Sequence, residues 1–490
     1  MTWNDLTKQL EVRQSGGGQN PVLTGVTCDS RTAGPGSLYV SIQGFKVNGD
    51  AFIKSAVDKG ASAVLSENPQ PACPVAWAQV PSARRALGLA SRAVYGIDMA
   101  KIRSVGVTGT NGKTTTAHLL QTLLQLVHGN DAVWMFGTIK YYEAGKTAAA
   151  HNTTPEAVEI FRDIAAAEKK PAAIVMEVSS HSLALHRVAG LAFDCGLFTN
   201  LTQDHLDFHA SMEEYYHAKK MLFTEYLKPG GRAVINTDDP YGQRLARELA
   251  GNPLVTFGRN EAADVRIVDW QCGWGATTVT LSLKGRREIL TSRLAGFFNV
   301  YNMTALAAAA TALGIGMDTV RRCCEAVETV PGRMDRVPLD APFSVFVDYA
   351  HTPDALVNVL STVKKIGAGR LICVFGCGGD RDKTKRALMG RAVAENADEA
   401  VVTSDNPRSE DPQAIVRDIL RGIPLDFPHT AIVDRREAIR KALSMARPGD
   451  CVVVAGKGHE DYQEIKGVRH HFDDREEVIK AFSEAKAHAR

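Results

Sequence analysis

A glycine-containing segment, Thr108–Thr115, constrains the fold of this chain more than any other feature. It reads Thr-Gly-Thr-Asn-Gly-Lys-Thr-Thr and follows the apolar run Ile102–Thr108, which is typical of a buried strand. A helix-compatible stretch comes next. A strand that ends in glycines and leads into a helix directs backbone N–H groups at one point, where the helix dipole favours an anion. The pattern therefore predicts an α/β domain with a P-loop that binds nucleotide phosphates.

Each polar residue of the loop has an expected role. Lys113 should reach the terminal phosphates, and the hydroxyl of Thr114 or Thr115 should bind Mg²⁺. The strict motif has Gly or Ala five residues before Gly112, where this chain has Val107. The segment is therefore a variant P-loop.

The composition is that of an ordinary globular protein. Of the 490 residues, 44% are hydrophobic and 23% are charged, and 57 basic against 55 acidic residues give a net charge of +2. No long run of like charge is present, so a nucleic-acid partner is not expected. At the usual domain size of ~100–200 residues, the chain should form about two to four domains.

Nothing in the sequence predicts export or membrane insertion. The start of the chain has neither the basic nor the apolar region of a signal peptide. The alanine-rich run Ala305–Leu313 is too short for a membrane span and indicates close helix packing. The nine cysteines are scattered, without the spacing of a zinc site or disulfide framework. We expect a cytoplasmic protein with reduced thiols, and no heptad or apolar stripe demands more than a monomer.

Three blocks of alternating strands and helices are predicted, at residues 1–100, 101–332 and 333–490. The first has strands at Ser37–Ile42 and Ala61–Leu65 around a helix at 51–60. The second and third favour mostly parallel sheets covered by helices, with a Rossmann-like unit at the C-terminus. The strand candidates of these two blocks are Ala173–Val178, Gly196–Thr199, Ala233–Asn236, Ser344–Asp348, Arg370–Phe375, Glu399–Thr403 and Cys451–Ala455.

Several polar residues of the second block have no obvious role on local grounds. Glu177 ends a buried-looking strand, where an acid is costly unless it is paired, caps a helix or binds a metal. His205 lies in the loop Asn200–Asp207, and the next helix carries the adjacent lysines Lys219 and Lys220. Taken alone, a loop histidine is usually structural or solvated, and a helix lysine is usually exposed.

A wider pattern implies roles for these residues, because the chain resembles the Mur ligase family. The family shares Gly-Thr-(Asn)-Gly-Lys-Thr as its ATP signature, and Met176–His181, Asn200–Asp207 and Ala295–Asn302 are similar to further family motifs. The resemblance covers essentially the whole chain. Family members phosphorylate a carboxylate with ATP and let an amine attack the acyl phosphate. The resemblance implies three domains that bind, in order, a UDP-linked substrate, ATP and an amino acid.

The resemblance also implies the catalytic residues. Glu177 matches a Mg²⁺ ligand and His205 matches a ligand of a second metal ion. Lys219, fifteen residues after Asp204, matches a carbamylated lysine (N6-carboxylysine), with Lys220 as the rival by adjacency. A carbamate is an anion, so it can bind Mg²⁺ where an ammonium would repel it. The implied catalytic residues are Lys113, Glu177, His205 and Lys219, and the implied metal ligands are Thr114, Thr115, Glu177, His205 and Lys219.

The ATP site is implied by three segments. Asn302 matches a residue at the adenine region, although asparagines at a helix start also suit helix capping. Arg333 and Asp348 match residues that grip the nucleotide once the third domain closes. The implied ATP-binding residues are Gly109, Thr110, Asn111, Gly112, Lys113, Thr114, Thr115, Asn302, Arg333 and Asp348.

The implied acceptor is UDP-N-acetylmuramoyl-L-alanyl-D-glutamate. Ser30, within Asp29–Arg31, and the loop Gln43–Gly49 match segments on the uridine side. A second group matches contacts to the sugar-peptide and the acceptor's carboxylate end, although its threonines also suit turn capping. These implied residues are Asn152, Thr153 and Thr154 at the sugar-peptide, and Ser179 and Arg187 at the carboxylate.

The third block decides which amino acid is added. Ser404–Arg408 resembles the Asp-Asn-Pro-Arg signature of members that add meso-diaminopimelate. Arg408 can hold the extra carboxylate of diaminopimelate, which lysine lacks, while Asp405 and Asn406 serve its ammonium. The implied diaminopimelate-binding residues are Arg381, Asp405, Asn406, Pro407, Arg408, Gly456 and Glu460.

Rival functions differ in what they require. A sister ligase would add L-lysine to the same nucleotide, or glutamate to folates, and a folate ligase is not expected to carry Asp-Ser-Arg or Asp-Asn-Pro-Arg. A P-loop NTPase switch would hydrolyse nucleotide without any amino acid. The turn Gly376–Gly379 lacks the full glycine spacing of a dinucleotide site, so NAD binding is not expected.

Overall fold

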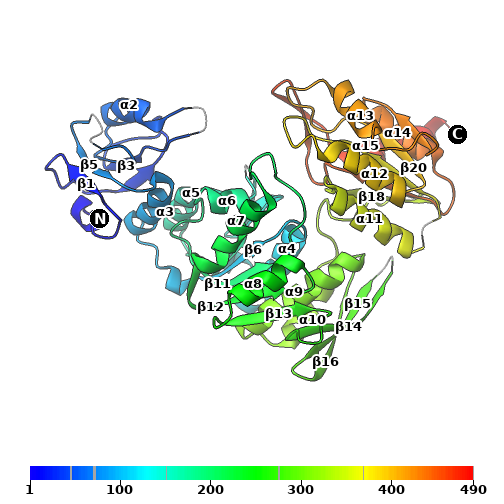
Figure 1. Ribbon diagram of the computed structural model, residues 1–490, viewed down its shortest axis with the longest axis horizontal. Coiled ribbons are helices and arrows are strands. Elements are labelled where there is room, and N and C mark those ends of the chain that lie inside the picture. Colours follow the sequence, from blue (N-terminus) through cyan, green and yellow to red (C-terminus); the bar gives the residue numbers. More distant parts are fainter. Residues whose placement is uncertain (45–46, 70–72, 151, 274–275, 368, 489–490) are drawn as a thin grey trace.

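Three sheet-based bodies make up the part of the chain that the computed structural model describes, residues 1–44, 47–69, 73–150, 152–273, 276–367 and 369–488. Within this part the three main sheets have five, eleven and six strands, and a hairpin forms a fourth, two-stranded sheet. The first body (blue) and the third (yellow to red) stand on either side of the central body (Figure 1). The predicted α/β class with mostly parallel sheets is confirmed.

The first sheet has the order β1-β5-β4-β3-β2, and every pairing except β1 with β5 is parallel. The predicted strands at 37–42 and 61–65 are β3 and β4, whereas β2, just before Asp29, was not predicted. The predicted helix at 51–60 is a 3-10 turn, η1, followed by the short α2. The elements are α1 (Trp3–Thr7), β1 (Gln14–Gly16), β2 (Gly25–Thr27), β3 (Ser37–Val40), η1 (Gly49–Phe52), α2 (Ile53–Asp58), β4 (Ala63–Ser66), β5 (Ala76–Gln79), α3 (Ala83–Val94) and η2 (Met99–Lys101).

The central sheet has the order β16-β15-β14-β13-β12-β11-β6-β10-β7-β8-β9. It is parallel from β14 to β7, and both edges are antiparallel extensions that the sequence pattern did not predict. Its strands are β6 (Arg103–Thr108), β7 (Val133–Phe136), β8 (Lys140–Glu143), β9 (Lys146–Ala149), β10 (Ala173–Glu177), β11 (Phe193–Phe198), β12 (Leu227–Asn236), β13 (Leu254–Gly258), β14 (Val265–Cys272), β15 (Thr277–Leu283) and β16 (Arg286–Ser292).

The strand before the P-loop, β6, lies near the middle of this sheet, between β11 and β10. Val105 and Val107 are fully buried there, in one core with α4 and α9. The alanine-rich run lies in α9 and packs tightly, as expected. No helix among the described residues is long and apolar enough to cross a membrane. The helices are α4 (Lys113–His128), η3 (Asn130–Ala132), α5 (Ala157–Ala166), α6 (Ser180–Ala184), α7 (Met212–Thr224), α8 (Pro240–Glu248), α9 (Phe297–Leu313) and α10 (Met317–Ala326).

The third sheet has the order β17-β18-β22-β19-β20-β21 and is parallel apart from β17. The segments after β18, β19, β20 and β22 leave from the same edge, where doubly wound sheets bind ligands. The elements are β17 (Asp335–Arg336), β18 (Ser344–Asp348), α11 (Pro353–Lys365), β19 (Leu371–Phe375), α12 (Lys385–Asn396), β20 (Glu399–Val402), α13 (Pro412–Leu420), β21 (His429–Ala431), α14 (Arg435–Met445), β22 (Cys451–Ala455), β23 (Tyr462–Ile465), β24 (Val468–His471) and α15 (Asp474–His488).

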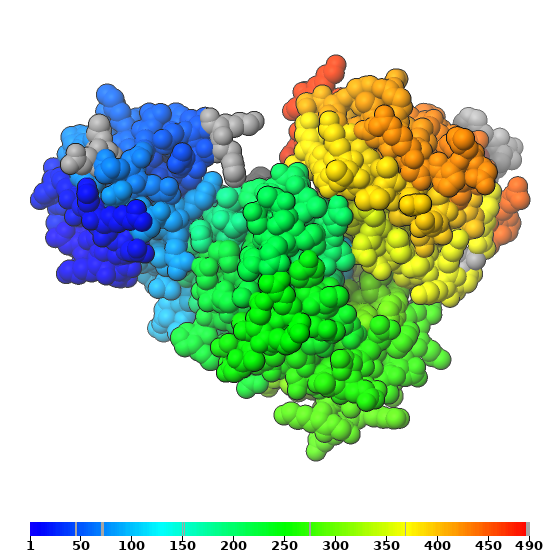
Figure 2. Space-filling model, in the orientation of Figure 1, coloured from blue at the N-terminus to red at the C-terminus, as the bar shows by residue number. Residues whose placement is uncertain are grey.

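The connections between the sheets support the predicted division of the chain. Residue 100 falls between α3 and β6, and residue 332 falls between α10 and β17. We therefore propose domains at 1–100, 101–332 and 333–490. The third domain lies in broad contact with the central one and stands apart from the first across the upper face (Figure 2).

The first and central domains meet through closely packed backbone. A Cβ on Gly88, in the middle of α3, would overlap the carbonyl oxygen of Ala189. Arg85 of the same helix forms an ion pair with Glu225 of the central domain at 2.8 Å. Helix α3 therefore anchors the first domain to the central one.

Replacing Gly88 with alanine tests this anchor. Ala normally stabilises a helix relative to Gly by ~1 kcal/mol. Here we expect G88A to lower the free energy of unfolding by about 1–3 kcal/mol, because the added methyl group overpacks the junction. Urea denaturation would measure the change, with G34A, which has open space around its Cβ, as the control. A stabilised G88A protein would contradict the tight junction.

Candidate active site

The P-loop closes tightly over the end of β6. Gly112 has φ +85° and caps α4, and a Cβ on Gly109 would overlap the hydroxyl of Thr199. The Lys113 ammonium donates to the carbonyl oxygens of Gly109 (3.0 Å) and Thr110 (2.9 Å). Burial lowers the pKa of Lys113. The loop therefore has the predicted phosphate-binding shape, with its lysine folded back onto the loop.

Glu177 joins three elements at the end of β10. Its carboxylate is fully buried and accepts hydrogen bonds from the Thr114 hydroxyl (3.0 Å) and from the backbone N–H (2.8 Å) and hydroxyl (3.0 Å) of Thr138. Arg333 of the third domain donates to the same Thr114 hydroxyl at 2.9 Å. The buried acid is thus hydrogen-bonded, as a buried charge requires.

Lys219 is distinguished from its neighbour by burial. Its side chain is 1% exposed, and its ammonium donates to the Gly109 carbonyl oxygen at 2.7 Å and lies 4.5 Å from the centre of the Tyr215 ring. Burial, with a smaller effect of nearby Lys113, lowers the pKa of Lys219 well below its ordinary value. Lys220 instead forms an ion pair with Glu248 at 2.8 Å. An exposed Lys219 is therefore excluded, and the geometry favours Lys219 over Lys220 for a role at the P-loop.

His205 faces the P-loop from a strained backbone conformation, with φ +57°. Its ring meets the ring of His181 edge-on, with centroids 4.8 Å apart, and its Nε2 lies 3.5 Å from an Asp204 carboxylate oxygen. Desolvation is the largest effect on its pKa, which falls to about 3. The imidazole is therefore neutral near pH 7, the form that binds metals.

The donor set fits Mg²⁺ only in part. The Thr114 hydroxyl and the Glu177 carboxylate supply the hard oxygen ligands that Mg²⁺ prefers. Thr115 is buried one residue further along and lines the nucleotide cavity described below. Among the described residues no group of three His, Cys, Asp or Glu side chains could hold a metal ion. Lys219 would add an anionic oxygen ligand as a carbamate, whereas its ammonium form would repel the metal.

A cavity of about 540 Å³, the nucleotide cavity, lies between the P-loop and the third domain. It is lined by five of the residues predicted to bind ATP, Asn111, Gly112, Asn302, Arg333 and Asp348, whose roles stay predictions. The aromatic residues Phe297, Phe298 and Tyr301, which were not predicted, also line it. Asn302 does not cap the helix, because the N-cap of α9 is Gly296.

Contacts across the nucleotide cavity connect the third domain to the P-loop. The Asn111 side-chain amide donates to an Asp354 carboxylate oxygen at 2.7 Å. Asp348 accepts from the backbone N–H groups of Met334 (2.6 Å) and Ala350 (2.7 Å), so it orders the loop beside Arg333. Asp354 was not predicted, because no local pattern shows which remote loop a helix-start acid will meet.

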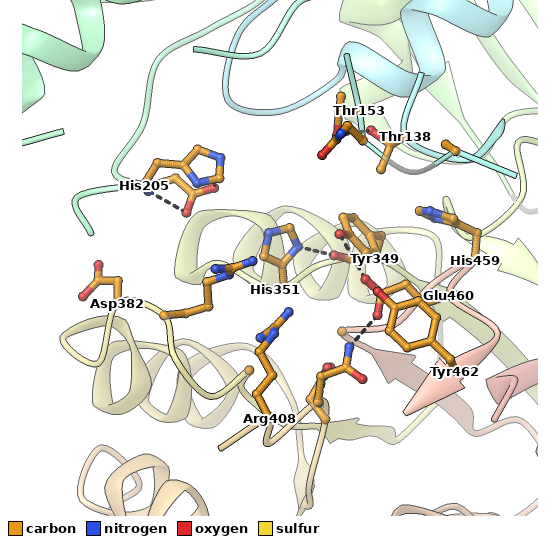
Figure 3. A pocket seen from close by; sticks show the side chains of 18 of the residues that line it. Thr138, Thr153, His205, Tyr349, His351, Asp382, Arg408, His459, Glu460 and Tyr462 are labelled. Atoms are coloured by element: carbon orange, nitrogen blue, oxygen red, sulfur yellow. Dashed lines mark hydrogen bonds and ion pairs between the residues drawn. The ribbon is translucent and has the colours of Figure 1, made fainter. Parts of the chain in front are cut away.

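A second cavity of about 470 Å³, the interdomain cavity, contains most of the predicted diaminopimelate residues. His205, Thr138 and Thr153 of the central domain lie across it from Arg408, Glu460 and Tyr462 (Figure 3). Its lining includes Asn152 and Thr153 on one side, and Arg381, Asp405, Asn406, Arg408, Gly456 and Glu460 on the other.

The polar residues of the third domain hold one another in place. Asn406 donates to Glu460 at 2.7 Å, and the fully buried Lys457 lies 3.2 Å from Asn406 Oδ1 and 3.4 Å from Glu460. Arg408 has φ +52° and donates to the Gly379 carbonyl oxygen at 2.8 Å. The buried Lys457 was not predicted, although it lies between the predicted residues Gly456 and Glu460.

Other residues of this group are arranged less tightly. Arg381 is exposed, and among the described residues its guanidinium donates a hydrogen bond only to the Asp380 carbonyl oxygen, at 3.5 Å. Pro407 packs its backbone against Gly379, where a Cβ would overlap the proline carbonyl. Lys385, which was not predicted, reaches from α12 to within 3.9 Å of Asp204 in the central domain.

The predicted acceptor residues lie along two domains. Ser30 is 9% exposed beside the ion pair of Asp29 and Arg31, at 2.7 Å. The Thr154 hydroxyl donates to the Glu177 backbone carbonyl at 2.7 Å, and Ser179 caps α6. Two of the residues in the predicted Gln43–Gly49 loop, 45 and 46, lie outside the described residues.

Comparison with known proteins identifies the class. Family models match as "Mur ligase family, catalytic domain" over residues 22–95, "Mur ligase middle domain" over 107–312 and "Mur ligase, glutamate ligase domain" over 332–458. The chain belongs to the Mur ligase family, and it is an ATP-dependent ligase. This assignment favours a ligase over the alternative P-loop switch.

The names of individual relatives are more specific than the family. A protein of Geobacter metallireducens named UDP-N-acetylmuramoyl-L-alanyl-D-glutamate--2,6-diaminopimelate ligase is 44% identical, over 99% of both chains. A protein of the same name from Gloeobacter violaceus is 45% identical over 95% of both. A solved structure of a protein with this name is 33% identical over 99% of both chains, with a TM-score of 0.70.

Substitution of Lys219 separates a carbamate from a simple ammonium. Arginine stays protonated and cannot form a carbamate, so we expect K219R to lower kcat on the order of 100-fold. Wild-type activity should fall when bicarbonate is removed, and the residual activity of K219R should not respond. Phosphate release from ATP measures both, with K220R as the matched control. An active K219R enzyme would rule out the carbamate.

His351 should make stability depend on pH. Burial is the largest of the effects that lower its pKa to about 4, against an ordinary 6.5. Between these values the unfolded state binds more protons, so the free energy of unfolding falls as the pH falls from 6.5 towards 4. From pH 7 to pH 5, H351Q should lose roughly 2 kcal/mol less stability than the wild type. Urea denaturation at both pH values tests this, and equal losses would contradict it.

Proposed function

We propose that this chain joins meso-diaminopimelate to the D-glutamate of UDP-N-acetylmuramoyl-L-alanyl-D-glutamate, converting ATP to ADP and phosphate. The observation that carries the proposal is the interdomain cavity, where Arg408, Asn406 and Glu460 face the P-loop side of the central domain. An arginine suits the additional carboxylate of diaminopimelate, which lysine lacks. The names of the relatives agree with this choice.

The first step is transfer of the ATP γ-phosphate to the D-glutamate side-chain carboxylate. The N–H groups of the P-loop, Lys113 and Arg333 surround the place where charge develops and stabilise it electrostatically. We propose that Thr114, Thr115, Glu177, His205 and carbamylated Lys219 would hold Mg²⁺, which would supply further positive charge beside the phosphates. Ser30, Asn152, Thr153, Thr154, Ser179 and Arg187 hold the acceptor nucleotide.

The second step is attack by the diaminopimelate amine on the acyl phosphate, which forms the amide and releases phosphate. Arg408 and Glu460 orient the amino acid so that its amine points across the interdomain cavity. Contacts from the third domain, Arg333 to Thr114 and Asp354 to Asn111, join it to the P-loop across the nucleotide cavity and would hold the two domains closed over the substrates. Closure excludes water, which would otherwise hydrolyse the acyl phosphate.

We further propose that the enzyme works as a monomer in the cytoplasm. The three domains contribute all the residues assigned above from one chain. Reduced cysteines fit this compartment, since all nine are free and six are buried.

An assay of phosphate release tests the function directly. ATP and UDP-N-acetylmuramoyl-L-alanyl-D-glutamate are supplied alone, with meso-diaminopimelate, or with L-lysine. We expect rapid release only with diaminopimelate. Equal rates with lysine would shift the assignment to the lysine-adding ligase, and release without any amino acid would contradict ligation.

Arg408→Lys tests the amino-acid site. Lysine cannot form a bidentate pair with a carboxylate, so the KM for diaminopimelate should rise about tenfold or more while the KM for ATP stays nearly unchanged. Arg421→Lys, at an arginine 77% exposed on the same domain, is the control. Equal increases in both KM values would refute the assigned role of Arg408.

A further inference from the structure

Two arginines at the junction of the first and central domains lack normal partners. Arg84 stands at the start of α3, and Arg187 follows α6; their side chains are each only 23% exposed. Helix α3, which carries Arg84, packs against α5, and α6, which precedes Arg187, lies next to them at the junction (Figure 1). Neither guanidinium donates a hydrogen bond to any described residue. For Arg187 this is unusual, because its Nε is buried and buried charged donors are almost always hydrogen-bonded.

The one charge these arginines share is poorly placed for both. Glu156, the residue before α5, has a carboxylate oxygen 3.0 Å from Arg187 Nε and 4.0 Å from Arg84 Nη1. The Arg187 Nε–H is nevertheless without an aligned acceptor. By contrast, the neighbouring Arg85 donates a hydrogen bond to Glu225 at 2.8 Å. The two arginines and one glutamate leave a net charge of +1 with unused N–H donors.

The position of this group, the arginine pair with Glu156, fits the path of the proposed acceptor. The pKa of the Cys28 thiol is raised to about 11, mainly by burial and to a smaller extent by the nearby negative charge of Glu156. Cys28 precedes Asp29–Arg31, the segment predicted for the uridine side, and Arg187 is predicted for the carboxylate end. A nucleotide that extends from one segment to the other would place its anionic groups beside Arg84 and Arg187.

We propose that Arg84 and Arg187 form a two-arginine anion site for the acceptor nucleotide, and that Glu156 occupies this site until the nucleotide's anionic group takes its place. The inference rests on the proposed function and adds Arg84 and Glu156 to the acceptor site. The anion is either the diphosphate or the D-glutamate carboxylate, since both present the oxygen acceptors that a guanidinium pairs with.

Displacement of Glu156 has a measurable proton signature. Its pKa is already raised by burial and by Glu159, against the lowering effects of Arg187 and Arg84. A bound anion that pairs with the arginines in place of Glu156 cancels their lowering effect, so the pKa of Glu156 rises further. Binding therefore takes up a proton and becomes tighter as the pH falls. Cys28 faces the group from the first domain and keeps its proton across the range. Calorimetry in two buffers of different ionisation enthalpy measures the uptake.

Binding of three nucleotides to the full chain tests the site. UDP, UDP-N-acetylmuramoyl-L-alanine and UDP-N-acetylmuramoyl-L-alanyl-D-glutamate are titrated into the wild type, R84Q, E156Q and the matched control R85Q. We expect R84Q to weaken binding about tenfold or more, R85Q to bind like the wild type, and E156Q to bind several-fold tighter without proton uptake. If R84Q weakens the binding of UDP itself, the anion is the diphosphate. If R84Q weakens only the binding of the dipeptide nucleotide, the anion is the D-glutamate carboxylate.

The outcomes separate this inference from the function on which it rests. If the wild type binds and R84Q binds equally well, or if R84Q and R85Q are weakened to the same extent, the arginine site is overturned while the proposed function stands. Weaker binding by E156Q overturns the displacement, because Glu156 would then only position Arg187. A wild type that binds none of the nucleotides overturns the proposed function itself. Thermal unfolding of each variant checks that the fold is intact.

Discussion

The buried carboxylate of Glu177 is the interaction on which the rest of the site depends. A fully buried charge is tolerated only when its oxygens are occupied, and here the acceptor bonds come from the P-loop helix and from the chain just after β7. Because Arg333 shares Thr114 with this acid, the third domain is also tied to it. One charge therefore aligns the phosphate loop, the neighbouring strands and the domain that covers them.

Parallel strands explain why the chemistry collects in one place. The P-loop, Glu177 and the loop of His205 follow β6, β10 and β11, whose carboxyl ends share one edge of the central sheet. Tyr349, Arg408 and Glu460 follow strands of the third sheet in the same way. The two edges face each other, so Arg408 and Glu460 of the third domain lie across the interdomain cavity from His205 and Thr153 of the central domain (Figure 3).

Local patterns predicted the parts of this arrangement that depend on short stretches of sequence. The central strands, the P-loop and helix α7 were found because apolar runs and glycines are local signals. The antiparallel edges β8–β9 and β15–β16 were missed, since solvated hairpins carry weaker apolar patterns. Contacts such as Asp354 with Asn111 and Lys385 with Asp204 join residues far apart in sequence, and no spacing rule predicts them.

The adjacent lysines of α7 show what burial adds to a motif. Successive residues of a helix point about 100° apart, so two identical side chains can enter opposite environments. Lys220 reaches Glu248 at the surface, whereas Lys219 turns inward beneath the Gly109 carbonyl. Burial lowers the pKa of Lys219, which increases the uncharged amine, and only that form can react with carbon dioxide. The fold that buries Lys219 thereby favours the uncharged amine from which the proposed carbamate would form.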